Sequence, residues 1–198
     1  MRIETLISSP YGENTYILDT GGGRAVIIDP GADGRLIKAK LNEMKLEPEF
    51  VFLTHGHYDH ILGLDAFEPL TVWAHEAERG LLENPEANLS AFLGSQISVK
   101  GINYYDGGFF RMNKFEFTHV PGHTGGCVLI GYEKHLFTGD TLFFDTVGRT
   151  DVPTGSSHRL KESLAVFDNM SEDLVCYPGH GDSFMLKTAR EVNYFLKK

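Results

Sequence analysis

Three imidazoles and a carboxylate fall within six positions of this chain. They are His55, His57, Asp59 and His60, and a short apolar run, 50–53, comes directly before them. Imidazole and carboxylate are the ligands that divalent zinc, iron and manganese favour. Because so dense a group is useful only when a positive charge lies among its members, the spacing predicts a metal site.

Three further candidate ligands lie in separate loops rich in glycine and proline. They are His123 in the stretch 120–126, Asp140 in 137–141 and His180 in 177–181. Each follows an apolar segment that is typical of a strand, and flanking glycines let the backbone come close to a bound ligand. A single histidine is usually a surface or packing residue. Four strand-end loops that each present a metal-type ligand are unusual for ordinary surface loops.

The hydrophobic pattern predicts the elements that present these side chains. The run 50–53 indicates a buried strand, so the histidine-rich turn lies where a strand opens into a loop. Further strands are expected at 2–7, 15–18, 24–28, 71–74, 109–112, 114–120, 126–131, 135–138 and 174–177. Helices are expected at 33–44, 61–67, 76–82, 85–93, 157–170 and 183–196. This mixture, repeated in two similar passes, favours a layered α/β fold.

The stretch from 75 to 110 carries no motif that points to a function. Two short helices are expected in it, on either side of Asn84-Pro85. We expect this part of the chain to be a lid or an insertion that faces the substrate.

Composition limits the class of protein. The 198 residues predict one domain over 1–198, with 41% hydrophobic and 23% charged residues. The formal net charge of −9 argues against nonspecific binding to nucleic acid or to a membrane surface. Two cysteines, Cys127 and Cys176, lie in apolar contexts and are expected to be small buried hydrophobes.

No signal peptide and no apolar run long enough to cross a bilayer is evident. We therefore expect a cytoplasmic monomer or homodimer that acts on a small molecule.

The seven candidate ligands together resemble the pattern of a known family. His-x-His-x-Asp-His, followed by a separated His, Asp and His, is similar to the metallo-β-lactamase superfamily and within it to the glyoxalase II-like hydrolases. The similar segments are 14–16, 28–31, 54–60, 121–126, 138–143, 148–151 and 177–181. The resemblance implies a four-layer αββα sandwich, with two mixed sheets packed face to face and helices outside.

The resemblance also implies a site for two divalent metals, zinc first, with iron or manganese also suited. Side chains two apart in an extended segment project to the same side, as His55 and His57 would. Asp29, at the end of a strand, resembles a carboxylate that orients a ligand histidine through its other ring nitrogen, and a plain turn acid that ends the strand is a nearly equal alternative. The implied ligands are His55, His57 and His123 for one metal, Asp59, His60 and His180 for the other, and Asp140 bridging both.

The implied reaction is hydrolysis, in which hydroxide from the two-metal site attacks a carbonyl. Asp59 is a candidate to take the proton of the water, and Arg149 to hold a substrate carboxylate. Asp151 falls where glyoxalase II has a tyrosine, and its pairing with Arg149 as a structural contact is an equal alternative. Few residues follow His180, so we expect no C-terminal helical domain for glutathione.

A thioester is the expected substrate, with S-lactoylglutathione as a candidate. The main alternative is a persulfide dioxygenase with a single iron, and a lactonase or phosphodiesterase of the same fold is another. The β-lactamases fit less well because they lack the bridging aspartate that Asp140 supplies. A non-catalytic metal-binding protein is a further alternative. The remaining histidines, 75, 119, 135 and 158, are expected not to bind metal.

Overall fold

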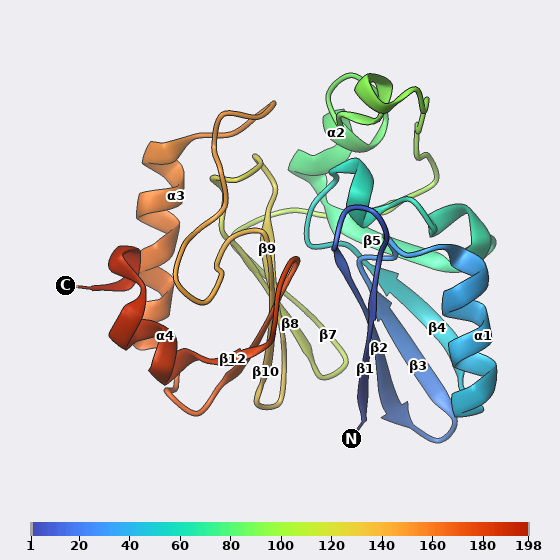
Figure 1. Ribbon diagram of the computed structural model, residues 1–198, viewed down its shortest axis with the longest axis horizontal. Helices are drawn as coiled ribbons and strands as arrows, with labels where there is room; N and C mark the ends of the chain where they lie inside the picture. Colours follow the sequence, from blue (N-terminus) through green and yellow to red (C-terminus); the bar gives the residue numbers. More distant parts are fainter. Residues whose placement is uncertain (1, 198) are drawn as a thin grey trace. The chain divides into compact units, whose positions relative to one another are not determined.

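The computed structural model describes residues 2–197, which form two compact units (Figure 1). Unit 1 consists of the chain up to Ala74 together with Arg79–Tyr104, and unit 2 consists of His75–Glu78 together with the chain from Tyr105 onward. Each unit is built around one six-stranded sheet. Among the described residues, no helix has the length and apolar character needed to cross a bilayer.

The first sheet keeps its strands in sequence order. They are β1 (Ile3–Ile7), β2 (Asn14–Gly21), β3 (Arg24–Ile28), β4 (Glu47–Phe52), β5 (Thr71–His75) and β6 (Asn103–Tyr105). The pairs β1–β2 and β2–β3 are antiparallel, whereas β3–β4 and β4–β5 are parallel. The parallel arrangement brings the ends of β3 and β4 to the same edge, which is where Asp29 and the histidine-rich turn begin.

A helix covers one face of this sheet. Helix α1 (Gly34–Met44) lies along β3 and β4 in Figure 1. Its N-cap is Asp33, whose side chain accepts a hydrogen bond from the amide of Arg35. Its fully buried Ile37 packs in one cluster with Ile27 and Val51 of the sheet. Burial of such aliphatic side chains stabilises the folded state by about 1.5–3 kcal/mol each.

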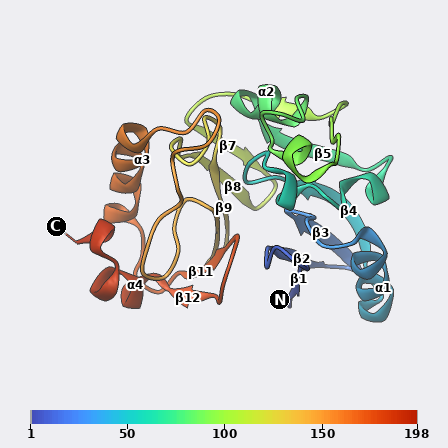
Figure 2. The ribbon, with the colours of Figure 1, turned by 45° about the horizontal axis from the view of Figure 1, so that its top comes forward.

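The second sheet holds β7 (Phe109–Met112), β8 (Phe115–His119), β9 (Val128–Tyr132), β10 (His135–Gly139), β11 (Val175–Pro178) and β12 (Phe184–Met185). Its neighbours are antiparallel, except for the parallel pair β10–β11. Helices α3 (Ser157–Ser163) and α4 (Leu186–Val192) lie on one side of this sheet (Figure 2). Leu164, which follows α3, and Leu186 pack there with both cysteines, which are free and buried as expected.

Two mixed sheets with flanking helices are therefore present, as predicted, but several helices are shorter than expected. The helix expected at 61–67 is a 3₁₀ turn at Leu64–Phe67, because the amide of Gly63 donates to the carbonyl of Pro30. The helix expected at 85–93 is reduced to a 3₁₀ turn at Ser90–Leu93, because Leu89 is in the left-handed region with a φ of 72°.

The C-terminal helix and the stretch from 75 to 82 also differ from expectation. Phe184 pairs with Cys176 as part of β12, so helix α4 starts only at Leu186. The helix ends at Val192, and the side chain of the next residue, Asn193, donates to the carbonyls of Phe143 and Thr146. In the earlier stretch, α2 (Arg79–Leu82) follows a 3₁₀ turn.

Candidate metal centre

The histidine-rich turn of unit 1 leaves the end of β4 and gathers three buried imidazoles. His55, His57 and His60 are each at most 4% exposed. His55 Nε2 lies 3.1 Å from His57 Nδ1, and the rings of His55 and His60 are 4.1 Å apart between centroids. Tyr58–His60 form one turn of 3₁₀ helix, which places Asp59 beside them. Imidazole nitrogens this close in a buried site are the donor set that a divalent metal takes.

Asp29 links the end of β3 to this turn. Its backbone is in the left-handed region, with a φ of 48° that aspartate tolerates better than most residues. The carboxylate accepts hydrogen bonds from the amide of Thr54 at 2.7 Å and from its hydroxyl at 2.5 Å, and it lies 3.0 Å from His60 Nδ1. With its proton held on Nδ1 by the carboxylate, His60 presents the lone pair of Nε2, which is the form that binds a metal.

The backbone of the ligand turn is in close contact with the segment after Asp29. A Cβ atom on Gly31 would lie 1.7 Å from the carbonyl oxygen of Asp59 and 2.3 Å from a carboxylate oxygen of Glu13. Only glycine therefore fits at position 31. The segment after Asp29 is thus packed directly against the backbone of the ligand turn.

Unit 2 brings the three dispersed candidates together. His123 Nε2 lies 3.5 Å from Asp140 Oδ2, and His180 Nε2 lies 3.7 Å from the same oxygen. His123 Nδ1 donates to the backbone carbonyl of Arg149 at 2.7 Å, so its Nε2 presents a lone pair towards the Asp140 carboxylate. A lone pair that faces a carboxylate oxygen favours a positive charge next to both, and this donor set therefore fits a divalent metal as well.

Each of these three side chains stands at the end of a different strand. His123 follows β8, Asp140 follows β10 and His180 follows β11. The ends of β10 and β11 are tied by a hydrogen bond from the amide of Gly179 to the carbonyl of Gly139, at 2.9 Å. The parallel pairing of these two strands thus brings Asp140 and His180 to one edge of the sheet.

The loop that carries Arg149 packs against two of these candidate ligands, His123 and Asp140. A Cβ atom on Gly148 would lie 1.9 Å from the carbonyl oxygen of Asp140 and 3.1 Å from His123 Nδ1. The backbone at 148–149 is thus in van der Waals contact with Asp140 and hydrogen-bonded to His123. No side chain fits between them, which explains a glycine at this position.

The side chain of Arg149 is largely exposed and paired with Asp151. Its Nε and one terminal nitrogen donate to the two carboxylate oxygens at 2.7 and 2.8 Å. Hydrogen bonding to Arg149 lowers the pKa of the Asp151 carboxyl to about 2. Arg149 also lines a cavity of about 770 Å³ within unit 2, together with Lys161 and the aromatic Tyr194 and Phe195.

The four remaining histidines have other contacts. His135 Nδ1 lies 3.0 Å from the hydroxyl of Tyr177, and His158 is exposed beside Glu162. His75 is buried, at 3% exposure, and stacks on His119. Within residues 2–197, none of the four belongs to a group of three or more side chains that could share a metal.

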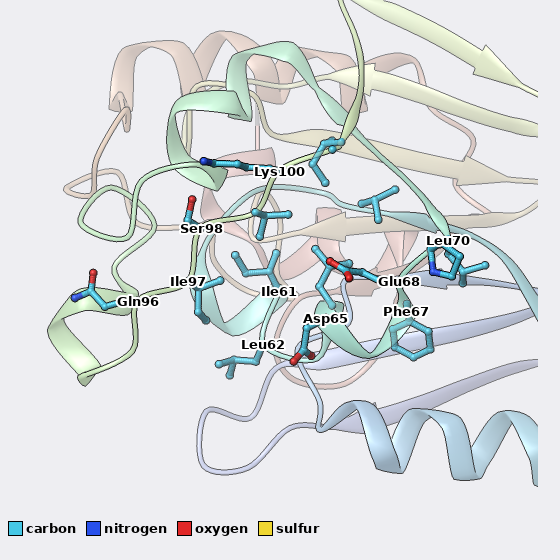
Figure 3. A pocket seen from close by; sticks show the side chains of 16 residues that line it. Ile61, Leu62, Asp65, Phe67, Glu68, Leu70, Gln96, Ile97, Ser98 and Lys100 are labelled. Atoms are coloured by element: carbon cyan, nitrogen blue, oxygen red, sulfur yellow. The ribbon is translucent and has the colours of Figure 1, made fainter.

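Unit 1 also contains a cavity behind the ligand turn, of about 490 Å³. Ile61 and Leu62, which directly follow His60, form part of its wall (Figure 3). The segment 96–102 lines the other side, and its Ile97 and Val99 pack against the core of unit 1. This part of the stretch expected to be a lid is therefore anchored in the core.

Two buried carboxylates near the ligand loops were missed in the sequence. Glu13 is fully buried beside Gly31, and burial is the main cause that raises its pKa well above the ordinary value. Glu78 is 1% exposed and contacts the loop after His123. Neither lies in a recognisable motif, and Glu78 in the run 76–79 has the composition of a solvated helix surface. No local signal marks either of them.

Comparison with known proteins extends the likeness over almost the entire chain. The family model described as the metallo-beta-lactamase superfamily matches residues 9–180. Hydroxyacylglutathione hydrolase GloC of Haemophilus influenzae is 30% identical over an alignment of 219 positions. The alignment covers 99% of this chain and 98% of that protein.

Two solved structures share the fold. BLEG-1, described as a B3 metallo-beta-lactamase, is 30% identical with a TM-score of 0.89, and the match covers 100% of both chains. TTHA1623, crystallised in a di-iron-bound form, is 29% identical with a TM-score of 0.87, over 98% of this chain and 100% of that one. The predicted fold class is confirmed by these matches.

Proposed function

This chain belongs to the metallo-β-lactamase superfamily, and we propose that it is a metal-dependent hydrolase that cleaves thioesters of the glyoxalase II type. The observation that carries the proposal is the likeness to hydroxyacylglutathione hydrolase GloC over nearly the full length of both chains. The candidate ligand groups of the two units support it, because each has the donor set of a hydrolytic metal site.

The proposed site holds two divalent metals with ligands from both units. His55, His57 and His123 would bind one, Asp59, His60 and His180 the other, and Asp140 both. The metals would supply Lewis-acid activation of water near neutral pH when bound. Zinc, iron and manganese all suit such ligands, and the di-iron form of TTHA1623 supports iron as an alternative to zinc.

The residues around the ligands have distinct roles in this proposal. Asp29 holds a proton on Nδ1 of His60, and the carbonyl of Arg149 holds one on Nδ1 of His123. The Nε2 atom of each ring therefore keeps a lone pair that can bind a metal. Asp59 would take the proton of the attacking water. This assignment requires no serine or cysteine nucleophile, in keeping with two cysteines that are both buried.

Arg149 is proposed to bind a carboxylate on the thiol part of the substrate. Its guanidinium is exposed and offers the bidentate geometry that carboxylates favour. The substrate carboxylate would replace the carboxylate of Asp151 as the partner of the Arg149 guanidinium. Because the chain carries a net charge of −9, a local cation of this kind is where an anionic small molecule would be held.

A substrate panel tests the proposal. Protein purified without added metal is assayed with S-lactoylglutathione, a neutral thioester, a lactone, a β-lactam and a phosphodiester. We expect S-lactoylglutathione to have the highest kcat/KM. The variant H57A should lose this activity, whereas H158A, which removes an exposed histidine, should keep it.

Two outcomes would replace the proposal. Turnover of the β-lactam without turnover of either thioester would favour a β-lactamase, a candidate that the likeness to BLEG-1 supports. Oxygen consumption with glutathione persulfide, in a protein with a single iron, would instead indicate a dioxygenase. Activity that survives in H57A would show that the metal ligands are assigned wrongly.

A further inference from the structure

A four-residue segment of the chain, His75–Glu78, leaves unit 1 and joins unit 2. Ala74 before it and Arg79 after it both belong to unit 1. The segment carries two buried polar side chains, His75 at 3% exposure and Glu78 at 1%. Neither has a part in the proposed reaction. Because burying a carboxylate is unfavourable unless it is hydrogen-bonded, the partners of Glu78 indicate what the segment is for.

Glu78 accepts two hydrogen bonds from the loop that follows His123. Its Oε1 lies 2.6 Å from the hydroxyl of Thr124 and 2.7 Å from the amide of Gly126. The contact is so close that a Cβ atom on Gly126 would lie 2.8 Å from Glu78 itself. One oxygen atom thus fixes a side chain and a backbone group within three residues of a candidate metal ligand.

His119, whose ring stacks on that of His75, contacts Gly125, the residue between Thr124 and Gly126. The ring centroids are 3.9 Å apart and the rings are nearly parallel, at 16°. His119 Nε2 lies 3.0 Å from the carbonyl of Gly125, to which it donates. His75 Nδ1 accepts from the amide of Ala77, so its other nitrogen carries a proton towards the carbonyl of Gly107, 3.2 Å away.

Stacking against a second imidazole disfavours the protonated form of the His119 ring. Burial lowers the pKa of His119, which agrees with the neutral form. Thr154 accepts from the amide of Gly125 on the far side of the loop. Three consecutive loop residues, 124–126, are therefore fixed by side chains that do not belong to the ligand set.

We propose that Glu78 is a positioning residue that fixes the loop 124–126 and thereby sets the orientation of His123 towards the metal. The inference rests on the proposed function for the identity of His123 as a ligand. Without Glu78, the Thr124 hydroxyl and the Gly126 amide would be buried without this acceptor. The loop would then favour conformations in which both groups reach water, and His123 would lose its fixed direction.

Metal affinity of the metal-free full chain tests this role, measured for Zn²⁺ by competition with a chelating dye. We expect E78A to bind Zn²⁺ about tenfold more weakly than the wild type, or worse, the range typical of residues that support metal ligands. E78Q keeps an oxygen acceptor and should restore affinity to within about threefold of the wild type. The control E86A removes an exposed carboxylate from the same stretch and should leave affinity unchanged.

A matched pair of variants separates positioning from general loss of stability. T124V removes only the hydroxyl that Glu78 accepts from, and it should weaken Zn²⁺ binding in the same direction as E78A. The double variant E78A/T124V should bind about as weakly as E78A alone, because the contact that T124V removes is already lost in E78A. The absorption spectrum of Co²⁺ bound to E78A should also differ from that of the wild type, since it reports the geometry of the ligands. If E78A does not fold, T124V and E78Q still decide the matter.

The results that would overturn the inference are specific. A folded E78A with wild-type Zn²⁺ affinity and an unchanged Co²⁺ spectrum would show that Glu78 does not position His123. Additive effects of E78A and T124V would show that the contact is not shared. A wild-type chain that binds no metal would instead refute the proposed function, and with it this role.

Discussion

The candidate ligands of unit 1 and those of unit 2 are organised differently. In unit 1 they occupy a single turn after one strand, and Asp29, just after the neighbouring strand, orients His60 through its side chain. In unit 2 they come from three loops, and His123 is oriented by a backbone carbonyl. The same chemistry is therefore built once from local sequence and once from tertiary contacts.

This difference determines how each group can be damaged. A carboxylate that orients a ligand can be removed by one substitution, as with Asp29. A backbone carbonyl cannot, so the ligand group of unit 2 is vulnerable through the packing of its loops, at Gly148 and at Glu78. In unit 1, we therefore expect substitution of a residue that contacts a ligand to change the orientation of that ligand directly. In unit 2, we expect such a substitution to act by shifting the loop that carries the ligand.

The largest effect is expected from removal of one ligand in each unit. H57A and D140A should each lower kcat/KM for the preferred thioester by about a thousandfold or more, because several kcal/mol of transition-state stabilisation are lost. Steady-state kinetics with H158A as the control measures this. A loss confined to one of the two variants would break the equivalence of the two groups.

A smaller but still large effect is expected for G148A. The added methyl would meet the carbonyl of Asp140 at 1.9 Å, so the loop must move away from Asp140 and His123. We expect kcat to fall about a hundredfold, the effect of misplacing reacting groups by about 1 Å. The control G125A places its methyl 3.4 Å from Thr154, an ordinary contact, and should remain within a few-fold of the wild type.

If G148A retained wild-type kcat, loop packing would not control the ligands of unit 2. A fall of equal size in G125A would point to general sensitivity of the loops rather than to this contact.

The orienting carboxylate of unit 1 can be tested without changing the backbone. Asparagine also tolerates the left-handed conformation of position 29, so D29N isolates the loss of charge. We expect Zn²⁺ affinity to fall by about 10- to 100-fold, because the amide no longer holds the proton on His60 Nδ1. Equilibrium competition with a chelator measures the Zn²⁺ affinity of D29N. An unchanged affinity would show that Asp29 does not orient His60 for metal binding.

The smallest effect is expected at the exposed Arg149–Asp151 pair. R149A should raise KM for S-lactoylglutathione several-fold, should leave kcat nearly unchanged, and should not affect a neutral thioester. D151N should not shift the midpoint of thermal unfolding, because exposed ion pairs contribute little to stability. Equal increases in KM for both thioesters would argue against a carboxylate contact at Arg149.

Sequence reasoning succeeded where the signal is local. The apolar segments predicted a layered α/β fold, and the spacing of His55 to His60 predicted a turn whose side chains the structure brings together. Glu78 and the carbonyl of Arg149 could not be found in this way, since their contacts with the His123 loop span more than twenty positions and depend on how loops pack. The prediction of a helix at 61–67 was wrong for a related reason. The amide of Gly63 donates to the carbonyl of Pro30, which is distant in the sequence.

The metal content of the chain tests the central claim most directly. Metal-free protein titrated with Zn²⁺, with binding followed by calorimetry, should take up two equivalents per chain. D140A should disturb both binding events, because Asp140 is assigned to both metals. A wild-type chain that binds one equivalent or none would contradict the claim that the two ligand groups form a two-metal hydrolytic site.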